Sequence, residues 1–216
     1  MLSDAAAVKA NIRARHRAAR AGRPQSELLP LGQGIGRHGL SWAQSVARPG
    51  STSFALYLGV GDEPPTTSLM EALHSQGYTV LLPICGPGRT LLWVRWTPEA
   101  TFARSRFAPV MEPEGERLDL AGASGSPEGT GLAGIILPAT AVDRSGNRIG
   151  QGGGYYDTFL AAIQRHGNIP PTIAVVYDDE VLPEGAIPGE PFDMRVQAAL
   201  TPGGLVTFHG PDSPAQ

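Results

Sequence analysis

The chain has 216 residues, which suffices for one globular domain, and 41% of them are hydrophobic. Its formal net charge of −3 gives no overall attraction to nucleic acid. The sequence has no run of about 18 apolar residues, so we expect no membrane span. Cys85 is the only cysteine, which excludes an internal disulfide and a thiolate zinc cluster. The first residues lack the apolar segment of a secretory signal, so we expect a cytoplasmic protein that binds neither nucleic acid nor membranes.

The N-terminal quarter predicts two helices of unequal clarity. Residues 4–21 have helical periodicity, with Val8, Ile12 and Ala19 on the apolar side. Residues 26–47 are a weaker candidate, because Pro30 and the glycines at 32, 34, 36 and 39 interrupt the pattern.

A basic stripe runs along another side of the first predicted helix. It consists of Lys9, Arg13, Arg17 and Arg20. Such a stripe is typical of a solvated helix face, but it can also reach an anionic ligand. Lys9 is the one lysine in a chain with 17 basic residues, which fits either a site that prefers a compact charge or chance retention.

The central part predicts a strand–helix–strand unit. Residues 53–60, 78–84 and 90–96 have strand character. Between the first two, Ser68 and Glu71 fit a capping box at the start of a helix that ends near Gly77. This order predicts a parallel sheet. Residues 97–131 are irregular and end in a small-residue run that predicts an exposed loop.

The second half continues the alternation of strands and helices. Residues 132–142 and 172–177 predict buried strands, and residues 196–200 predict an edge strand. The helix predicted for residues 155–166 faces the core with Tyr156, Phe159, Leu160 and Ile163. Together these elements predict an α/β fold, an open and mostly parallel Rossmann-like sheet flanked by helices, as a single domain over residues 1–208. Residues 209–216 predict a disordered tail.

The segment Asp143–Asp157 joins a predicted strand to a predicted helix and is rich in glycine. Its glycines are Gly146, Gly150, Gly152, Gly153 and Gly154. In an open α/β sheet such a loop is a ligand site, and glycines let backbone N–H groups converge on an anion beside a helix N-terminus. This indicates phosphate binding, with at least one positive φ among residues 152–154, although a tight turn that binds nothing is the alternative.

The glycine segment matches neither common nucleotide motif. It lacks the Gly-Lys-Ser/Thr of a Walker loop, and its glycine spacing breaks the dinucleotide fingerprint. Tyr155 and Tyr156 follow the glycines and predict one ring in the core and one at the site. Asp157 would lie in the first turn of the helix, where it either caps the helix or holds a Mg²⁺ that bridges phosphates.

The run GNRIGQGGGYYD resembles the signature of the 5-formyltetrahydrofolate cyclo-ligase family, and the resemblance extends over most of the chain. Lys9 and Arg13 are similar to the ATP-contacting residues of the family's N-terminal helix. Leu58 and Glu63 stand where the family contacts folate, and Glu112-Pro113 resembles a recurrent pair. Asp193 stands where the family has a second metal-associated acid.

The resemblance implies ATP-driven closure of 5-formyltetrahydrofolate to 5,10-methenyltetrahydrofolate, with ADP and phosphate released, by a monomer that uses Mg²⁺. The implied ATP contacts are Lys9, Arg13, Arg148, Ile149, Gly150, Gln151, Gly152, Gly153, Gly154, Tyr155 and Tyr156. The implied folate contacts are Leu58, Glu63, Gln151, Gly152, Gly153, Gly154 and Tyr155. The implied metal ligands are Asp157 and Asp193.

Some residues depart from the family pattern. Gln151 stands where many relatives have a basic residue, and Gln197 replaces an expected acid, which weakens Asp193 as a metal ligand more than Asp157. Three alternatives therefore stay open: a paralogous enzyme with another substrate, a sugar-phosphate isomerase-like or CoA-transferase-like protein, and a non-catalytic nucleotide-binding module.

Overall fold

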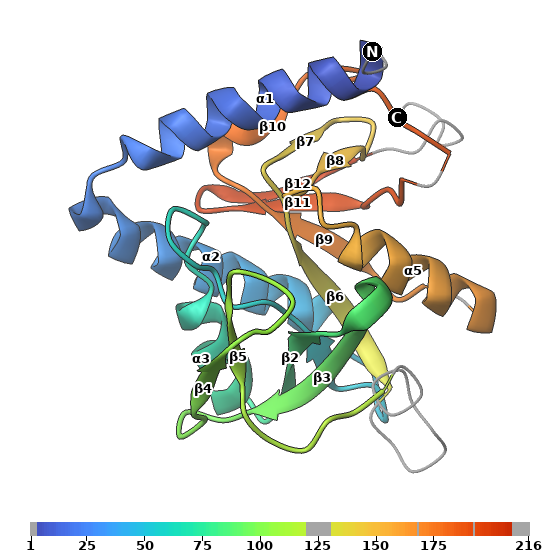
Figure 1. Ribbon diagram of the computed structural model, residues 1–216. Helices are drawn as coiled ribbons and strands as arrows, with labels where there is room; N and C mark the ends of the chain where they lie inside the picture. Colours follow the sequence, from blue (N-terminus) through green and yellow to red (C-terminus); the bar gives the residue numbers. More distant parts are fainter. Residues whose placement is uncertain (1–3, 120–130, 168, 192, 209–216) are drawn as a thin grey trace.

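The computed structural model describes residues 4–119, 131–167, 169–191 and 193–208, which form an α/β domain (Figure 1). Its central sheet has seven strands in the order β12-β11-β9-β6-β1-β2-β3. The five inner strands pair in parallel, whereas β12 and β3 pair antiparallel at the two edges. The predicted open, mostly parallel sheet is confirmed.

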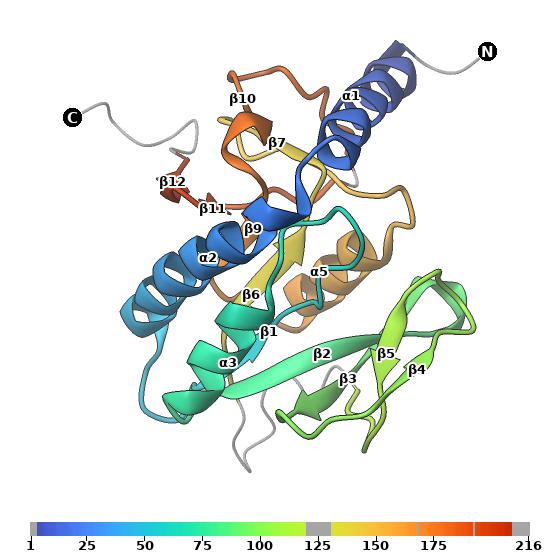
Figure 2. The ribbon, with the colours of Figure 1, turned by 90° about the vertical axis from the view of Figure 1, so that its left-hand side faces the viewer.

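The strands of this sheet are short. They are β1 (Ser53–Ala55), β2 (Thr79–Cys85), β3 (Leu91–Trp96), β6 (Leu132–Pro138), β9 (Thr172–Val175), β11 (Ala198–Thr201) and β12 (Gly204–Thr207). A second sheet has β10 (Val181–Leu182), β7 (Ala141–Asp143) and β8 (Arg148–Ile149), and a third has β4 (Phe102–Arg104) and β5 (Met111–Pro113). The last two strands form an arm beside the main sheet (Figure 2).

Helices cover both faces of the central sheet. The helices are α1 (Asp4–Ala21), α2 (Gln25–Val46), α3 (Thr67–Ser75) and α5 (Tyr155–His166), with 3₁₀ turns η1 (Pro87–Arg89) and η2 (Asp178–Glu180). The core on one face joins Trp42 of α2 and Leu69 of α3 to Phe54 and Ile136. The core on the other face joins Phe159, Leu160 and Ile163 of α5 to the sheet, as the helix periodicity predicted.

Helix α2 is continuous, although its glycines and Pro30 made it a weak prediction. The glycines are required by close packing: a Cβ on Gly34 would lie 2.4 Å from the carbonyl oxygen of Pro202, and one on Gly39 would lie 2.7 Å from Leu69. The glycines therefore let α2 approach α3 and the β11–β12 turn, and tertiary packing overrides their low helix propensity.

Helix α1 has the predicted bounds, and Ile12 of its predicted apolar side packs against a small core, but the prediction of the buried side was wrong for Val8 and Ala19. Val8 is 38% exposed and Ala19 is exposed, whereas Lys9, His16 and Arg20 are buried. The polar side of α1 is buried because its neighbours there are carboxylates and a cavity.

Two further boundaries differ from the predictions. Strand β1 stops at Ala55, and α3 begins after Thr66 without the predicted Ser68–Glu71 capping box. The Thr66 hydroxyl instead fastens the preceding loop, since it donates to the carbonyl of Tyr57 at 2.7 Å and accepts from the amide of Gly59 at 3.0 Å.

The two predicted strands near the C-terminal half also change. The predicted strand 132–142 splits into β6 and β7, which belong to different sheets. The strand near residue 200 is not an edge, because β12 pairs along it. The predicted loop at 121–131 and the tail 209–216 lie almost entirely outside the described residues, so the tail and the domain boundary at 208 stay predictions.

Candidate active site

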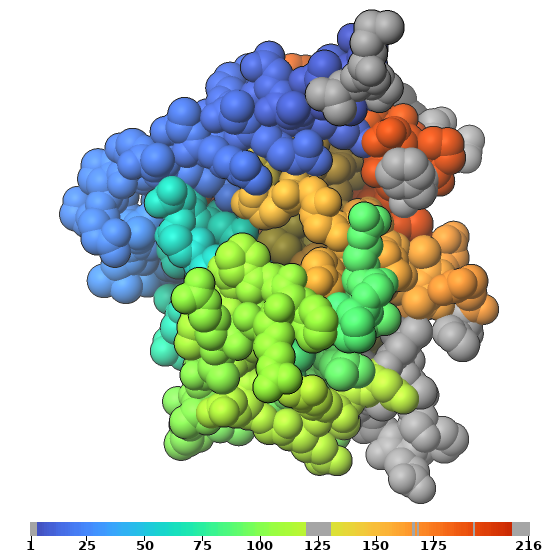
Figure 3. All heavy atoms as spheres, viewed as in Figure 1, coloured from blue at the N-terminus to red at the C-terminus, as the bar shows by residue number. Residues whose placement is uncertain are grey.

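A cavity of about 1570 Å³ opens beside the carboxyl ends of β1, β2 and β6. The surface is hollowed there between α1, the β2–β5 region and the segment that leads to α5 (Figure 3). Ligand sites of open α/β folds occupy this position. Every residue that the sequence predicted for the site lines this cavity except Ile149.

The glycine-rich loop forms one wall of the cavity between β8 and α5. Gly152 has φ +97° and Gly154 has φ +71°, which confirms the predicted positive φ. Gly154 is the N-cap of α5, and no side chain caps this helix end. The loop therefore offers free backbone donors and the positive end of a helix dipole to the cavity.

Arg148 enters the cavity from β8 and is only 8% exposed. Its terminal nitrogen donates to Oδ1 of Asp157 at 2.6 Å, and the same oxygen accepts the amide of Met194 at 3.3 Å. The Nε atom of Arg148 is buried and has no hydrogen-bond partner among the described residues. A buried donor without an acceptor is costly, which indicates a ligand acceptor beside Arg148.

Lys9 reaches from α1 to two acids on the segment before β11. Its Nζ lies 2.7 Å from Oε2 of Glu190 and 2.6 Å from Oδ2 of Asp193. Burial by itself lowers the pKa of Lys9, but the hydrogen bonds and charges of Asp193 and Glu190 outweigh burial and raise the pKa. Lys9 is therefore a fixed positive charge at the rim of the cavity.

The rest of the basic stripe also faces the cavity and the glycine loop. Nε of Arg13 donates to the carbonyl oxygen of Gly150 at 2.8 Å, and Arg17 donates to the side chain of Gln151. Arg20 forms a buried bidentate pair with Glu180 and also donates to the carbonyl of Ala139 at 2.7 Å. The basic stripe of α1 therefore lines the cavity and is not simply a solvent-exposed helix face.

Opposite the glycine loop, the segment after β1 supplies the residues that were expected to contact folate. Leu58 and Glu63 are half-buried and line the cavity. Burial raises the pKa of Glu63, although the amide of Val60 donates to its carboxylate at 3.3 Å. Burial likewise raises the pKa of the Tyr156 hydroxyl. A carboxyl that binds a proton more readily is suited to paired hydrogen bonding with a neutral heterocycle.

Ile149 takes a structural role instead, and so does Gln197, which was noted only as a departure from the family pattern. The Ile149 side chain packs with Ala141, Leu182 and Ile187 in a small core, away from the cavity. The side chain of Gln197 accepts the amide of Thr172 at 2.5 Å and does not line the cavity.

Tyr57 was missed by sequence reasoning. It is buried, and its hydroxyl has no partner among the described residues although it borders the cavity. Tyr57 lies in an apolar run that the sequence predicts as a strand, so no local pattern marked it as a site residue.

Asp157 and Asp193 fit a divalent cation that arrives with a ligand. Each lines the cavity and presents hard carboxylate oxygens, which Mg²⁺ prefers. Within the described part of the chain, no three acidic, histidine or cysteine side chains gather as a self-sufficient metal site.

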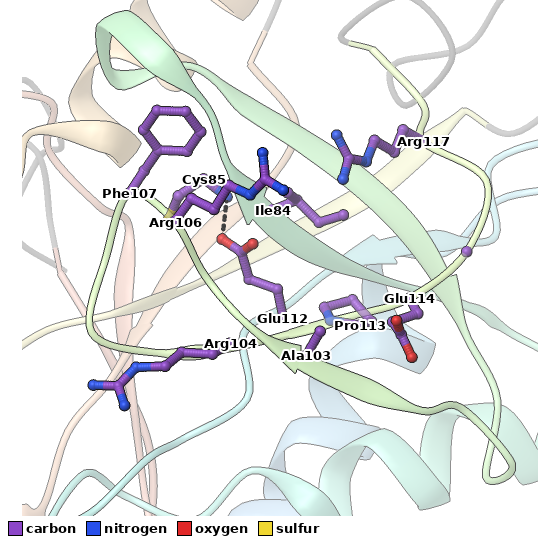
Figure 4. A pocket seen from close by; sticks show the side chains of 11 residues that line it. Ile84, Cys85, Ala103, Arg104, Arg106, Phe107, Glu112, Pro113, Glu114 and Arg117 are labelled. Carbon is purple, nitrogen blue, oxygen red and sulfur yellow. Dashed lines mark hydrogen bonds between the residues drawn. The ribbon is translucent and has the colours of Figure 1, made fainter.

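A smaller cavity of about 610 Å³ adjoins the large one and shares Cys85, Phe107 and Pro113 with it. Glu112 accepts the amide of Cys85 at 2.7 Å, so the recurrent Glu-Pro pair holds the β5 arm against β2 (Figure 4). Burial, helped by Glu112, raises the pKa of the Cys85 thiol to about 11. Cys85 is therefore a packing residue at neutral pH.

Solved structures with a similar fold are methenyltetrahydrofolate synthetases. The Aquifex aeolicus 5,10-methenyltetrahydrofolate synthetase is 24% identical, with a TM-score of 0.67 and 97% of each chain covered. The Mycoplasma pneumoniae enzyme is 16% identical, with a TM-score of 0.64, 92% of this chain and 99% of that chain covered. At these identities the likeness establishes the fold.

Sequence relatives are closer. The chain is 37% identical to a 5-formyltetrahydrofolate cyclo-ligase of Mycolicibacterium smegmatis over 167 residues, covering 74% of this chain and 78% of that protein. It is 28% identical to the mouse 5-formyltetrahydrofolate cyclo-ligase, covering 69% and 73% of the two chains. Across the described ranges, no helix has the length and apolarity needed to cross a membrane.

Fold and cavity define an α/β protein in which a glycine loop and a basic helix line one large cavity. The profile of the 5-formyltetrahydrofolate cyclo-ligase family matches residues 6–202, so the chain belongs to that family and the predicted resemblance is confirmed.

Proposed function

We propose that this protein closes 5-formyltetrahydrofolate to 5,10-methenyltetrahydrofolate at the expense of Mg-ATP, releasing ADP and phosphate. The single observation that carries the proposal is the cavity in which the glycine loop, the basic side of α1 and the Leu58–Glu63 segment face one another. Family membership supports the reaction type.

The nucleotide binds at the loop end of the cavity. Backbone N–H groups of residues 150–154, the N-terminus of α5, Arg148, Arg13 and Lys9 surround the phosphates. Arg13 already contacts the loop through the carbonyl of Gly150, so phosphate binding requires little movement of α1. Such pre-positioning lowers the entropic cost of bringing the reactants together.

The folate binds between the loop and the segment after β1. Leu58 supplies an apolar contact and Glu63 supplies hydrogen bonds, with Tyr155 and residues 151–154 on the opposite wall. The formyl oxygen then faces the terminal phosphate of the nucleotide.

The chemistry follows from the poor leaving ability of an amide-like oxygen. The formyl oxygen attacks the terminal phosphorus and ADP leaves. The neighbouring anilino nitrogen attacks the activated carbon and loses its proton, and the C–O bond breaks with departure of phosphate. Phosphoryl transfer needs positioning and charge neutralisation rather than a protein nucleophile, and the cavity offers arginines and backbone donors for it.

Asp157 and Asp193 would hold Mg²⁺ together with the phosphates. The ion supplies charge neutralisation between the phosphate oxygens. For Asp157 to bind it, the contact with Arg148 must be shared or released, which frees Arg148 for the nucleotide. The pairing of Asp193 with Lys9 allows the same exchange.

The test is the appearance of methenyltetrahydrofolate absorbance after mixing the protein with 5-formyltetrahydrofolate and Mg-ATP. We expect product only when ATP and Mg²⁺ are both present, with one ADP released per product. Asp157→Asn should abolish most turnover, whereas Asp179→Asn, at an exposed acid outside the cavity, should leave it unchanged. Turnover without ATP would overturn the proposal.

A paralogous activity is the second candidate, favoured by the departure at Gln151. Arg17 donates to Gln151 and thereby brings a positive charge to this position from α1. If the protein hydrolyses ATP with another substrate but forms no methenyltetrahydrofolate, the result would support the paralogous activity. The expected cytoplasmic location and monomeric state stay predictions.

A further inference from the structure

Arg89 is a cavity-lining residue to which neither the sequence motif nor the family resemblance assigns a role. It lies at the tip of the β2–β3 hairpin, in the turn Pro87–Gly88–Arg89–Thr90. The amide of Thr90 donates to the carbonyl of Pro87 at 3.4 Å, and the amide of Gly86 donates to the carbonyl of Thr90 at 2.9 Å. The turn is thus closed on both sides and holds Arg89 in place.

The backbone of this turn is unfavourable for arginine. Gly88 has φ +65° and Arg89 has φ +62°, the only positive φ of a non-glycine residue among the described residues. A residue with positive φ in a turn is favourably glycine, because a Cβ makes this conformation less stable. A long charged side chain there costs stability, and such outliers occur where the side chain serves a site.

The guanidinium of Arg89 points at the glycine loop. A Cβ placed on Gly154 would lie 3.4 Å from a terminal nitrogen of Arg89 and 3.5 Å from its Cδ. Gly154 is the N-cap of α5, so a cation rests against the positive end of a helix dipole. This arrangement is repulsive unless an anion lies between them.

A buried donor beside the same loop lacks an acceptor. Nε of Arg148 is buried without a partner among the described residues, and the exposed Arg89 lines the same cavity. Arg148 and Arg89 approach the loop from β8 and from the β2–β3 hairpin, two separate elements that line one cavity. An anion with several oxygens would satisfy both arginines and the helix end.

We propose that Arg89 is a catalytic arginine that binds the terminal phosphate of the nucleotide from the side opposite α1 and neutralises charge during phosphoryl transfer. This inference rests on the proposed function. Arginine supplies a planar fork of donors that matches phosphate oxygens and stays charged at any working pH. The hairpin delivers it as a separate element over the loop, which is how transferred phosphoryl groups are stabilised in other enzymes.

The test compares Arg89→Gly, Arg89→Lys and Arg95→Ala. Arg95 is an exposed arginine of the same hairpin outside the cavity, so its variant controls for loss of charge. We expect Arg89→Gly to lower kcat/KM for ATP by roughly 10- to 100-fold with little change in KM for folate. Arg89→Lys should recover part of the loss, and Arg95→Ala should match the wild type.

Two readouts separate this role from a structural one. Because glycine suits the turn, Arg89→Gly should melt at or above the wild-type temperature while activity falls. Added guanidinium ion should restore part of the activity of Arg89→Gly, and it should not raise that of Arg95→Ala. A lowered melting temperature that accounts for the lost activity, or unchanged kcat/KM for ATP in an active protein, would overturn the role of Arg89. Absence of methenyltetrahydrofolate formation by the wild type would instead overturn the proposed function.

Discussion

Helices α1 and α2 follow one another in the chain and pack by different means. Helix α2 packs through glycines that bring its backbone against α3 and Pro202, where a Cβ would collide. Helix α1 packs through charged side chains, with Lys9 and Arg20 buried against acids and its apolar Val8 exposed. A helix that lies over a polar cavity therefore buries its polar side, whereas a helix that packs on the hydrophobic core depends on close steric fit.

The largest expected loss of stability comes from removing the buried ion pair near the C-terminal end of α1. Arg20→Ala removes the bidentate partner of Glu180, which is 1% exposed. An uncompensated buried charge typically costs about 3–5 kcal/mol, so urea unfolding should show a loss of this size. Arg23→Ala removes two ion pairs with exposed acids, Glu27 and Asp179, and a ring contact with Tyr177, and it should cost about 1 kcal/mol or less. Equal losses would show that the buried pair does not fix α1.

The next effect tests the packing of α2. Gly34→Ala places a methyl group 2.4 Å from the carbonyl oxygen of Pro202, so the helix or the turn must shift. Overpacking of this kind costs about 1–3 kcal/mol, which thermal unfolding will measure. Gly22→Ala adds a methyl with only ordinary contacts at 3.6 Å and is the matched control. A neutral Gly34→Ala would mean that the glycines of α2 are dispensable.

The smallest effect concerns the pH dependence that α1 confers through His16. Burial lowers the pKa of His16, while the charges of Glu180 and Asp179 oppose this and those of Arg15 and Arg20 add to it. In the unfolded chain His16 therefore binds a proton near pH 6.5, whereas in the folded protein it binds a proton only at lower pH. The free energy of unfolding therefore decreases as the pH falls below 6.5. His16→Gln should flatten the dependence of the free energy of unfolding on pH between pH 7.5 and 5.5, as measured by urea unfolding. An unchanged curve would contradict the burial of a neutral His16.

The sequence predicts the repetitive features of this fold and the local chemistry of its site. Alternating strands and helices, the core side of α5 and the positive φ in the glycine loop depend on neighbouring residues, so periodicity and composition suffice. The orientation of α1 depends on Glu180, Glu190 and Asp193, which lie far away in the chain. No local pattern reports such partners.

The remaining misses have the same origin. The glycines of α2 are read as helix breakers until Pro202 and Leu69 are seen beside them. Strand β1 ends early because Thr66 fastens the following loop. Arg89 carries no motif, and its significance comes from a backbone angle and from the proximity of Gly154. The residues that the family resemblance named for the site line one cavity, except Ile149, whose side chain packs in a small core, and their binding roles stay predictions.

We expect the basic side of α1 to bind the ligand, whereas α2 contributes to stability. The direct test is the melting temperature of wild type, Arg13→Ala and Gly34→Ala with and without Mg-ATP. ATP at about 100 times its Kd should stabilise the wild type by about 2.7 kcal/mol. Arg13→Ala should melt near the wild type without ligand yet lose most of the ATP shift, and Gly34→Ala should melt lower but keep that shift. The reverse pattern, with the ATP shift intact in Arg13→Ala, would contradict the account.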